Sequence, residues 1–502
     1  MTVITLSLVS HTNAGKTTLA RTLLARDVGE VRDAPHVTES ASMHELVASP
    51  EGDSLRLWDT PGFGDSARLV RRLQGSAQPL GWFLSAVWDR WRDRAFWASQ
   101  QALRHVQADS DVLLYLVNAA ESPAAAGYVA PEMELLAWVG KPVLVLLNQL
   151  GAPRAAAEEA ADIEAWRTHL ARWPGVRDVL PLDAFARCWV HELTLLRAVQ
   201  AVLDGERAAA CARLAAAWQA QREATFGAAM QGLADSLARA AGARETLDKG
   251  DDWAERLRRL GAALATAVNP QREATDPAAA AQARLAEALQ AEARQSTAAL
   301  LVLHGLSGSA QGEILGRVAG QFALHQRVPE GRAAILGGAV TGALAGLKAD
   351  IVSGGLTLGG GLLAGGLLGA LGAAGVARGI NVVRGTGQSW VAWSADALQG
   401  ATEAALLRYL AVAHFGRGRG EWTQGEAPPH WQQTVAQALA PQREALAAVW
   451  SGRSRRLDEA DDPARLAAAL RPLLEQATRE ALRSLYGARA RASPVTVMGE
   501  GR

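Results

Sequence analysis

The sequence predicts an α/β domain with a mostly parallel sheet and helices on both faces, followed by a mainly α-helical domain. Strand-like apolar runs alternate with helical patterns over residues 1–204, which is typical of parallel strands joined by crossover helices. The chain is then rich in Ala, Leu, Arg and Glu with helical periodicity, over 206–330 and 395–490. A Gly-rich apolar tract at 333–387, expected to be a hairpin, separates these stretches. We therefore expect the second domain to be 205–502.

The composition limits the classes of function. The chain has 502 residues, of which 49% are hydrophobic, and a formal net charge of +0. This length allows sizeable cores, and the balanced charge does not indicate a nucleic-acid partner. The two cysteines, Cys188 and Cys211, do not indicate a disulfide framework, so a reducing cytoplasm fits. The N-terminal stretch has no basic region of signal-peptide type, so we expect a first strand there.

The elements of the first domain follow from the spacing of apolar residues. Short apolar runs bounded by turn residues predict strands at 2–9, 42–48, 53–58, 112–118, 142–147 and 176–182. Apolar residues at helical spacing predict helices at 16–27, 81–107, 131–139, 154–172 and 185–203. The sequence Pro-Glu-Gly-Asp joins the second strand to the third, so we expect these two to form an antiparallel hairpin at one edge of the sheet.

The first candidate site is the turn between the first strand and the first helix, Ser-His-Thr-Asn-Ala-Gly-Lys-Thr-Thr. Such a turn directs backbone N–H groups and a helix N-terminus at an anion. In this pattern Lys16 reaches the β- and γ-phosphates, and the Thr17 hydroxyl binds Mg²⁺. Ser10 replaces the first glycine of the pattern, while Gly15 keeps a Cβ away from the phosphates. The residues expected to contact nucleotide are Ser10, Thr12, Asn13, Ala14, Gly15, Lys16, Thr17 and Thr18.

Lysine usage supports a working phosphate site. The lysines are Lys16, Lys141, Lys249 and Lys348, and nearly every other cation is Arg. A phosphate cradle needs a compact point charge on a flexible stem, which a planar guanidinium is not. The alternative is a chance Gly-Lys-Thr at the start of a helix, and the flanking strand and helix argue against it.

Further residues complete the predicted site. Asp59 ends a strand-like run and Gly62 follows it in Asp-Thr-Pro-Gly, so the carboxylate can hold Mg²⁺ and the Gly62 amide can bind a γ-phosphate. Thr38 lies in a polar segment between the two motifs, and we expect it to contact Mg²⁺ and the γ-phosphate. The predicted metal-binding residues are Thr17, Thr38 and Asp59, and the predicted catalytic residues are Lys16, Thr38 and Gly62.

These motifs resemble the Era/TrmE-type, translation-factor-class P-loop GTPases, and more narrowly uncharacterised bacterial members with a C-terminal helical domain of unknown function. The resemblance covers about 1–204 and rests on Asn13, Thr38 and Asp-Thr-Pro-Gly. It implies GTP and GDP as ligands, Mg²⁺ as cofactor, and a switch driven by hydrolysis. Phe63 stands where Ras-like enzymes have a glutamine that orients water. The asparagine that matches Asn13 helps to hold K⁺ in some relatives, which implies K⁺ as a second cofactor.

The base-reading motif departs from the family pattern Asn-Lys-x-Asp. The chain has Asn-Gln-Leu-Gly at 148–151, so the asparagine is kept and the guanine-binding carboxylate is absent. Its loss should weaken discrimination between bases, because a site that pairs those donors rejects analogues strongly. Asp183 lies near the expected Ser-Ala-Lys loop and is a candidate to replace the missing carboxylate. The predicted base contacts are Asn148, Gln149, Asp183 and Ala184.

Two segments suggest partners. The Trp-rich helix at 81–97 either packs within the protein or presents a surface to a protein partner or a second copy. The stretch 333–377 has sets of glycines four residues apart, such as Gly342/Gly346 and Gly361/Gly365/Gly369, and carries only Lys348 and Asp350 as charges, which is typical of closely packed membrane helices. It predicts either contact with the cytoplasmic membrane or a soluble, tightly packed helical hairpin.

The preferred hypothesis is a cytoplasmic GTPase, associated with the inner face of the membrane through 333–377, whose nucleotide state switches the helical domain. One alternative is a nucleotide-binding scaffold with little or no hydrolysis. The other is a membrane-remodelling mechanoenzyme with relaxed base specificity.

Overall fold

The computed structural model describes most of the chain, in twelve stretches. These are 1–12, 14–24, 42–63, 66–74, 94–149, 156–182, 189–247, 277–305, 380–384, 389–413, 430–453 and 462–490. The described residues form two compact units, one built mainly on 1–224 and the other on 225–412 and 427–487. The division falls within one long helix, and the boundary predicted at 204/205 stays a prediction.

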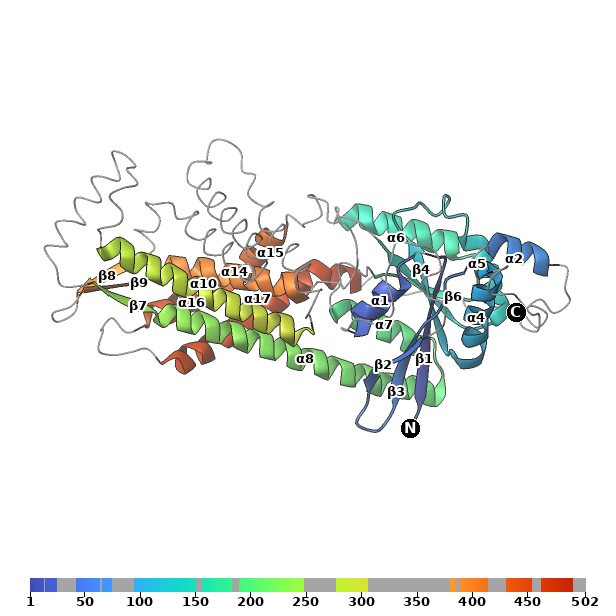
Figure 1. Ribbon diagram of the computed structural model, residues 1–502, viewed down its shortest axis with the longest axis horizontal. Coiled ribbons are helices and arrows are strands. Elements are labelled where there is room, and N and C mark those ends of the chain that lie inside the picture. Colours follow the sequence, from blue (N-terminus) through green and yellow to red (C-terminus); the bar gives the residue numbers. More distant parts are fainter. Residues whose placement is uncertain are drawn as a thin grey trace. The chain divides into compact units, whose positions relative to one another are not determined.

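The first unit contains a six-stranded sheet with the order β2-β3-β1-β4-β5-β6. Figure 1 shows this sheet with helices on both of its sides. Its strands are β1 (Val3–Ser10), β2 (Ser42–Ala48), β3 (Ser54–Asp59), β4 (Val112–Asn118), β5 (Val143–Asn148) and β6 (Val176–Pro181). The pair β2 and β3 is antiparallel, and the other pairings described in this sheet are parallel. The predicted strands and the predicted edge hairpin are confirmed.

Burial explains why apolar runs formed these strands. The interior strand β5 is buried along its whole length, as expected for a parallel strand covered on both faces, whereas the edge strand β2 consists mostly of partly buried and exposed residues. Because parallel strands point the same way, the carboxyl ends of β1 and β3 lie on the same side of the sheet, with Leu8 paired with Asp59. The loops that carry the candidate site leave the sheet on this side.

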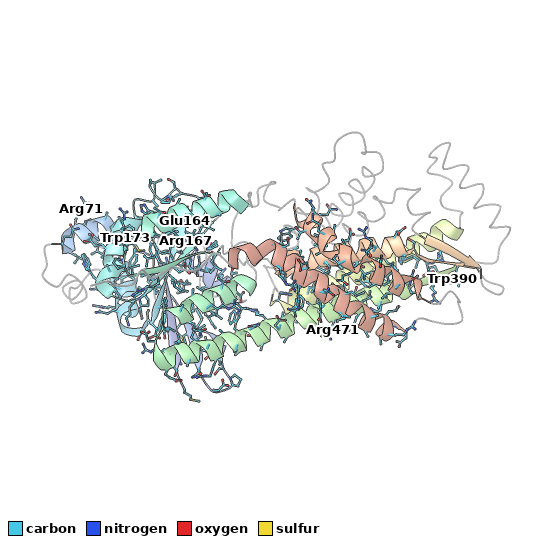
Figure 2. The ribbon with its side chains drawn as sticks, turned by 180° about the vertical axis from the view of Figure 1, so that it is seen from behind. Arg71, Glu164, Arg167, Trp173, Trp390 and Arg471 are labelled. Carbon is cyan, nitrogen blue, oxygen red and sulfur yellow. The ribbon has the colours of Figure 1, made fainter. Side chains whose placement is uncertain are left out.

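Helices cover both faces of the sheet. They are α1 (Lys16–Leu24), α2 (Ser66–Leu73), α4 (Arg94–Asp109), α5 (Val129–Val139), α6 (Ala156–Leu170) and α7 (Trp189–Ala201). One core joins the sheet to α1, α7 and the first turns of α8 (Gly205–Gly242), and the other joins it to α2, α4, α5 and α6. Arg167 of α6, which is labelled in Figure 2, donates to the carbonyl oxygen of Val179 in β6 at 3.4 Å. The predicted α/β class is confirmed.

The helix α2 is absent from the sequence-based prediction. Its apolar residues, Leu69, Val70 and Leu73, are too few to show a helical period against the arginines around them. All three are buried against the second core, so packing on the sheet decides this helix. The helix predicted at 81–107 begins at Arg94 within the described residues, and 81–93 lie outside them.

The second unit is mainly helical, as predicted. It contains the end of α8 and α10 (Pro277–Leu303), α14 (Ala395–Ala413), α15 (His430–Leu439), η2 (Ala440–Gln442), α16 (Arg443–Ser451) and α17 (Pro463–Ala490). Figure 2 labels Arg471 of α17, whose guanidinium donates to the side-chain oxygen of Gln231 in α8 at 3.2 Å. Within the described stretches, no helix is both long enough and apolar enough to span a membrane. The tract at 333–377 lies outside them.

A small antiparallel sheet in this unit is missing from the sequence-based prediction. Its strands are β7 (Arg244–Leu247), β8 (Ile380–Arg384) and β9 (Ser389–Trp393), in the order β7-β9-β8. Arg244 of β7 lies over the ring of Trp390 in β9, with 5.0 Å between the guanidinium carbon and the ring centroid. Strands this short carry little local signal, and their pairing depends on partners far away in the sequence.

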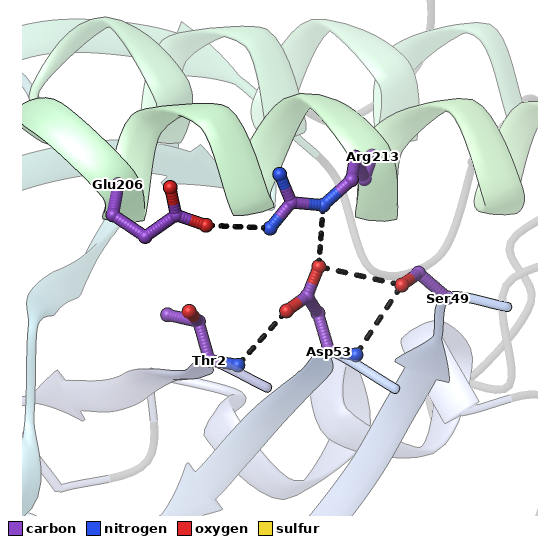
Figure 3. Close-up of polar contacts among 5 residues, drawn as sticks. All are labelled: Thr2, Ser49, Asp53, Glu206 and Arg213. Carbon is purple, nitrogen blue, oxygen red and sulfur yellow. Dashed lines mark hydrogen bonds and ion pairs between the residues drawn. The ribbon is translucent and has the colours of Figure 1, made fainter. Parts of the chain in front are cut away.

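A buried carboxylate ties the β2–β3 turn to α8 within the first unit (Figure 3). Asp53 accepts a hydrogen bond from the Nε of Arg213 at 2.7 Å and another from the backbone N–H of Thr2 at 2.8 Å. Arg213 also donates to Glu206 at 2.8 Å. The Asp53 side chain is 1% exposed, and the hydrogen bond from Arg213 lowers the pKa of Asp53 to about 2.

We expect this contact to make stability depend on pH in acid. Because the pKa of Asp53 falls from 3.8 to about 2 on folding, its contribution is fully present above pH ~4 and is lost as the pH falls towards 2. Urea unfolding midpoints between pH 2 and 7 should show a shallower acid dependence in Asp53→Asn than in the wild type. Glu51→Gln, which changes an exposed carboxylate in the same turn, is the matched control. Identical acid profiles for Asp53→Asn and wild type would contradict this expectation.

Candidate phosphate-binding site

The turn between β1 and α1 needs a glycine at its last position. Gly15 has φ +90°, a conformation that residues with a side chain rarely adopt, and a Cβ there would lie 2.7 Å from Nδ2 of Asn148. The carbonyl oxygen of Gly15 accepts the N–H of Leu19 at 2.9 Å, which forms the first turn of α1. The backbone thus leads from a buried strand into a helix N-terminus, the arrangement that binds phosphate groups.

Lys16 is nearly enclosed at this turn. Its side-chain ammonium donates to the Ser10 hydroxyl at 2.9 Å, and the residue is 7% exposed. Burial lowers the pKa of Lys16, while the nearby charges of Asp59 and Glu132 raise it. A Cβ on Gly62 would lie 3.0 Å from the Lys16 Nζ and 3.0 Å from the Thr12 Cα, so the structure brings these three residues together.

Thr17 and Asp59 form the second part of the site. The Thr17 hydroxyl donates to Oδ2 of Asp59 at 2.6 Å, while Oδ1 of the same carboxylate is buried with no hydrogen-bond partner in the described part of the chain. Burial raises the pKa of Asp59, and the hydrogen bond from Thr17 and the charge of Lys16 oppose that rise. A hydroxyl beside a carboxylate with a spare oxygen is a suitable ligand set for Mg²⁺, which prefers hard oxygen donors.

The segment from Asp59 to Phe63 runs beside the phosphate loop. The Thr60 hydroxyl donates to the carbonyl oxygen of Leu8 at 2.6 Å. The N–H of Phe63 donates to the carbonyl oxygen of Ser10 at 2.9 Å. The Phe63 side chain is fully buried in the core with Leu69. Phe63 therefore anchors the segment and leaves its backbone next to the loop.

Asn148, at the end of β5, supports the loop from the other side. Its side-chain amide donates to the carbonyl oxygen of Ala14 at 2.8 Å, and the residue is fully buried. Gln149 follows with φ 58°. The structure thus places Asn148 against the phosphate loop, and Thr18 is buried on the first turn of α1. The remaining predicted site residues, Asn13, Thr38, Asp183 and Ala184, lie outside the described residues.

A polar cluster beside the loop was missed by reasoning from the sequence. His11 Nδ1 lies 2.8 Å from Oε1 of Glu132, and the Tyr115 hydroxyl donates to Oε2 of the same carboxylate at 2.8 Å. The His11 ring stacks on Tyr128, with centroids 4.8 Å apart. Burial raises the pKa of both Glu132 and Tyr115. The only signal in the sequence is a glutamate beside Met133 on the apolar face of a helix.

Among the residues that the structure describes, other reactive groups give no second site. Cys211 is buried, and burial raises the pKa of its thiol to about 11, so it is not an activated nucleophile. In the stretches that the structure describes, no group of three or more His, Cys, Asp or Glu side chains is arranged to hold a metal ion.

Comparison with known proteins supports a GTPase domain. Residues 5–149 match the family model described as 50S ribosome-binding GTPase. Era of Aquifex aeolicus bound to GDP and AlF4⁻ is 17% identical over 41% of this chain and 58% of that chain, with a TM-score of 0.30. Era in complex with MgGDPNP and 16S ribosomal RNA is 18% identical over 41% of this chain and 58% of that chain, with a TM-score of 0.31. The bacterial selenocysteine-specific elongation factor EF-Sec is 14% identical over 36% of this chain and 26% of that chain, with a TM-score of 0.24.

These structural likenesses are too weak to carry a functional argument, and the chain spans 58% of the length of the Era chains it matches. None of the curated proteins matches it. The family match and the local geometry nevertheless coincide, because both fall on the segment from β1 to β5. Residues 5–149 are therefore similar to the P-loop GTPase domain that this family model describes.

Proposed function

We propose that this chain binds GTP with Mg²⁺ at the turn after β1 and hydrolyses the β–γ phosphoanhydride with water. The observation that carries the proposal is the buried cluster at this turn. There the Lys16 ammonium lies beside Ser10 and Gly62, and the Thr17–Asp59 pair keeps one carboxylate oxygen spare. A buried cation beside such a pair matches the charge of a Mg²⁺–triphosphate.

Each residue has a separate role in this proposal. Lys16 stabilises charge on the β- and γ-phosphates, and the Gly62 N–H binds the γ-phosphate from a position where the neighbouring Lys16 and Thr12 leave no room for a side chain. Thr17 and Asp59 would hold Mg²⁺, with Thr38 as a further ligand proposed from the sequence. When bound, Mg²⁺ would neutralise charge that develops on the phosphate oxygens.

The direct test is equilibrium binding of GTP, GDP, ATP and XTP to the full chain, with and without Mg²⁺. We expect Mg²⁺-dependent binding of triphosphates, with weaker selectivity for guanine over adenine than an Asn-Lys-x-Asp protein shows. Gly151→Asp should raise that selectivity, because it restores a carboxylate for the guanine donors. No binding of any nucleotide would reject the proposal. Strong selectivity that Asp183→Ala destroys would assign the missing carboxylate to Asp183.

Hydrolysis should depend on the monovalent cation. Phe63 is buried and cannot orient a water molecule, so we propose that Asn13 helps to hold a K⁺ ion that takes over part of an arginine finger's role. Turnover should then be faster in K⁺ than in Na⁺ at matched ionic strength, because only a bound cation would neutralise charge on the phosphates. Asn13→Ala should remove the difference. Equal turnover of the wild type in both salts would reject the role of K⁺, and no turnover in either salt would favour the scaffold alternative.

We further propose that the nucleotide state switches the helical unit and that 333–377 contacts the inner face of the cytoplasmic membrane. This part rests on the sequence, and co-sedimentation of the full chain with liposomes, with and without triphosphate, tests it. Liposome-stimulated turnover would favour the mechanoenzyme alternative. If the protein does not bind liposomes, the soluble helical hairpin is the remaining interpretation of 333–377. A partner or a dimer formed through 81–97 would be detected by measuring the mass of the protein in solution. No nucleic-acid partner is proposed.

A further inference from the structure

Glu132 of α5 is a buried carboxylate that the proposed chemistry does not use. It is 0% exposed, and its two oxygens are each hydrogen-bonded, one by His11 and the other by Tyr115, both at 2.8 Å. The three residues come from three different places in the first unit: the phosphate loop, β4 and α5. Together they form a chain of contacts from the core to the loop, called here the His11–Glu132–Tyr115 chain.

The position of this carboxylate is costly for folding. Met133 and Leu136 beside it on α5 are buried in the apolar core, and a carboxylate there must be compensated by hydrogen bonds. An apolar side chain of similar volume would fill such a place at least as well. The carboxylate does supply what an apolar residue cannot, an acceptor in a fixed position for the His11 ring. The Tyr128 ring stacks on the same imidazole at 21° between planes, so the ring is held in two directions.

His11 connects this chain of contacts to the segment that would sense the γ-phosphate. Its backbone pairs with that of Phe63 in a parallel bridge, and the Phe63 N–H donates to the Ser10 carbonyl oxygen at 2.9 Å. Gly62 directly precedes Phe63 and packs against Lys16 and Thr12. A restraint on His11 is therefore also a restraint on where the Gly62 N–H points.

We propose that Glu132 and Tyr115 act through His11 as positioning residues that hold the Gly62 backbone where it favours a nucleoside triphosphate over a diphosphate. The inference rests on the proposed function, because it concerns the γ-phosphate at the same site. A GTP γ-phosphate lies beyond the β-phosphate, so only the triphosphate reaches the Gly62 amide. Misplacing that amide by a fraction of an ångström weakens triphosphate binding and leaves the diphosphate contacts at Lys16 and the loop in place.

The test is the ratio of dissociation constants for GDP and a non-hydrolysable GTP analogue, measured by calorimetry on the full chain with Mg²⁺. For Glu132→Gln and His11→Ala we expect triphosphate affinity to fall about tenfold, within the usual range for coupled sites, while GDP affinity changes less than about twofold. Tyr115→Phe, the mildest change, should move the ratio in the same direction. His11→Asn should recover the ratio, because its side-chain amide can place a donor near the position of Nδ1.

Glu134→Gln is the matched control, because Glu134 is a partly buried glutamate on the same helix that bonds the exposed side chain of Gln74 instead. It should leave the ratio unchanged. If the variants of Glu132, His11 and Tyr115 lost GDP and triphosphate binding equally, these residues would support the loop in general. That result would overturn the inference. An unchanged ratio in Tyr115→Phe and His11→Ala would overturn it as well. A wild type that binds neither nucleotide would instead refute the proposed function, and the inference with it.

Discussion

The variant Lys16→Ala is expected to lose GTP binding while the chain stays folded. The ammonium donates to the Ser10 hydroxyl, interacts with the charges of Asp59 and Glu132, and is almost enclosed. A triphosphate in this turn would take up several charge-assisted hydrogen bonds from it. Removing them should weaken binding by at least about a hundredfold, since hydrogen bonds to charged groups are the stronger ones.

Calorimetry with GTP and Mg²⁺ measures this effect, and thermal unfolding checks the fold. Lys141→Ala removes a partly buried lysine just before β5 and serves as the control, with GTP affinity expected to stay at the wild-type value. The folded state of Lys16→Ala should survive, because its ammonium gives up solvation on burial and an alanine carries no such cost. Unchanged GTP affinity in folded Lys16→Ala would contradict the proposed site.

The second large effect is expected from Asp59→Asn, which should remove the dependence of hydrolysis on Mg²⁺. The carboxylate accepts from Thr17 through one oxygen and has a second, buried oxygen available. An amide in its place offers one oxygen, no charge and a competing N–H group, so it is a poor partner for a divalent cation. Turnover with saturating Mg²⁺ should fall by on the order of 10²–10³-fold, as when one electrostatic stabiliser is removed.

Turnover is measured in a titration with Mg²⁺, together with GTP binding in Mg²⁺ and in EDTA. In the wild type, EDTA should weaken binding, whereas Asp59→Asn should bind alike in both. Asp109→Asn, at a half-exposed carboxylate on α4, is the control and should keep the wild-type Mg²⁺ response. A wild-type Mg²⁺ titration in Asp59→Asn would remove Asp59 from the proposed site.

The strands of the first unit could be predicted because each one carries its own signal. A parallel strand buried on both faces must be apolar along most of its length, as β4 and β5 are, and turn residues mark its ends. The same reasoning fails for α2 and for the small sheet β7-β9-β8. These elements are short, and contacts with distant parts of the chain decide them.

The candidate site likewise contains some residues that the sequence identifies and others whose contacts only the structure shows. Gly15, Lys16 and Thr17 can be recognised in sequence because phosphate binding needs them at fixed spacing in one turn. The sequence also placed Asp59 and Gly62 at a strand end. It could not show that Asn148 supports the loop, since a lone asparagine after a strand has no local geometry of its own.

The amino-acid sequence by itself determined the class of the first domain and the position of the phosphate loop, and it predicted the residues that we propose for Mg²⁺. Only the tertiary structure decided that His11 meets Glu132, 121 residues away, and that Asp53 meets Arg213, 160 residues away. The physical reason is the range of the interactions involved. Apolar periodicity and loop spacing act between neighbours along the chain, whereas a buried charge finds its partner only after folding has brought two remote elements into contact.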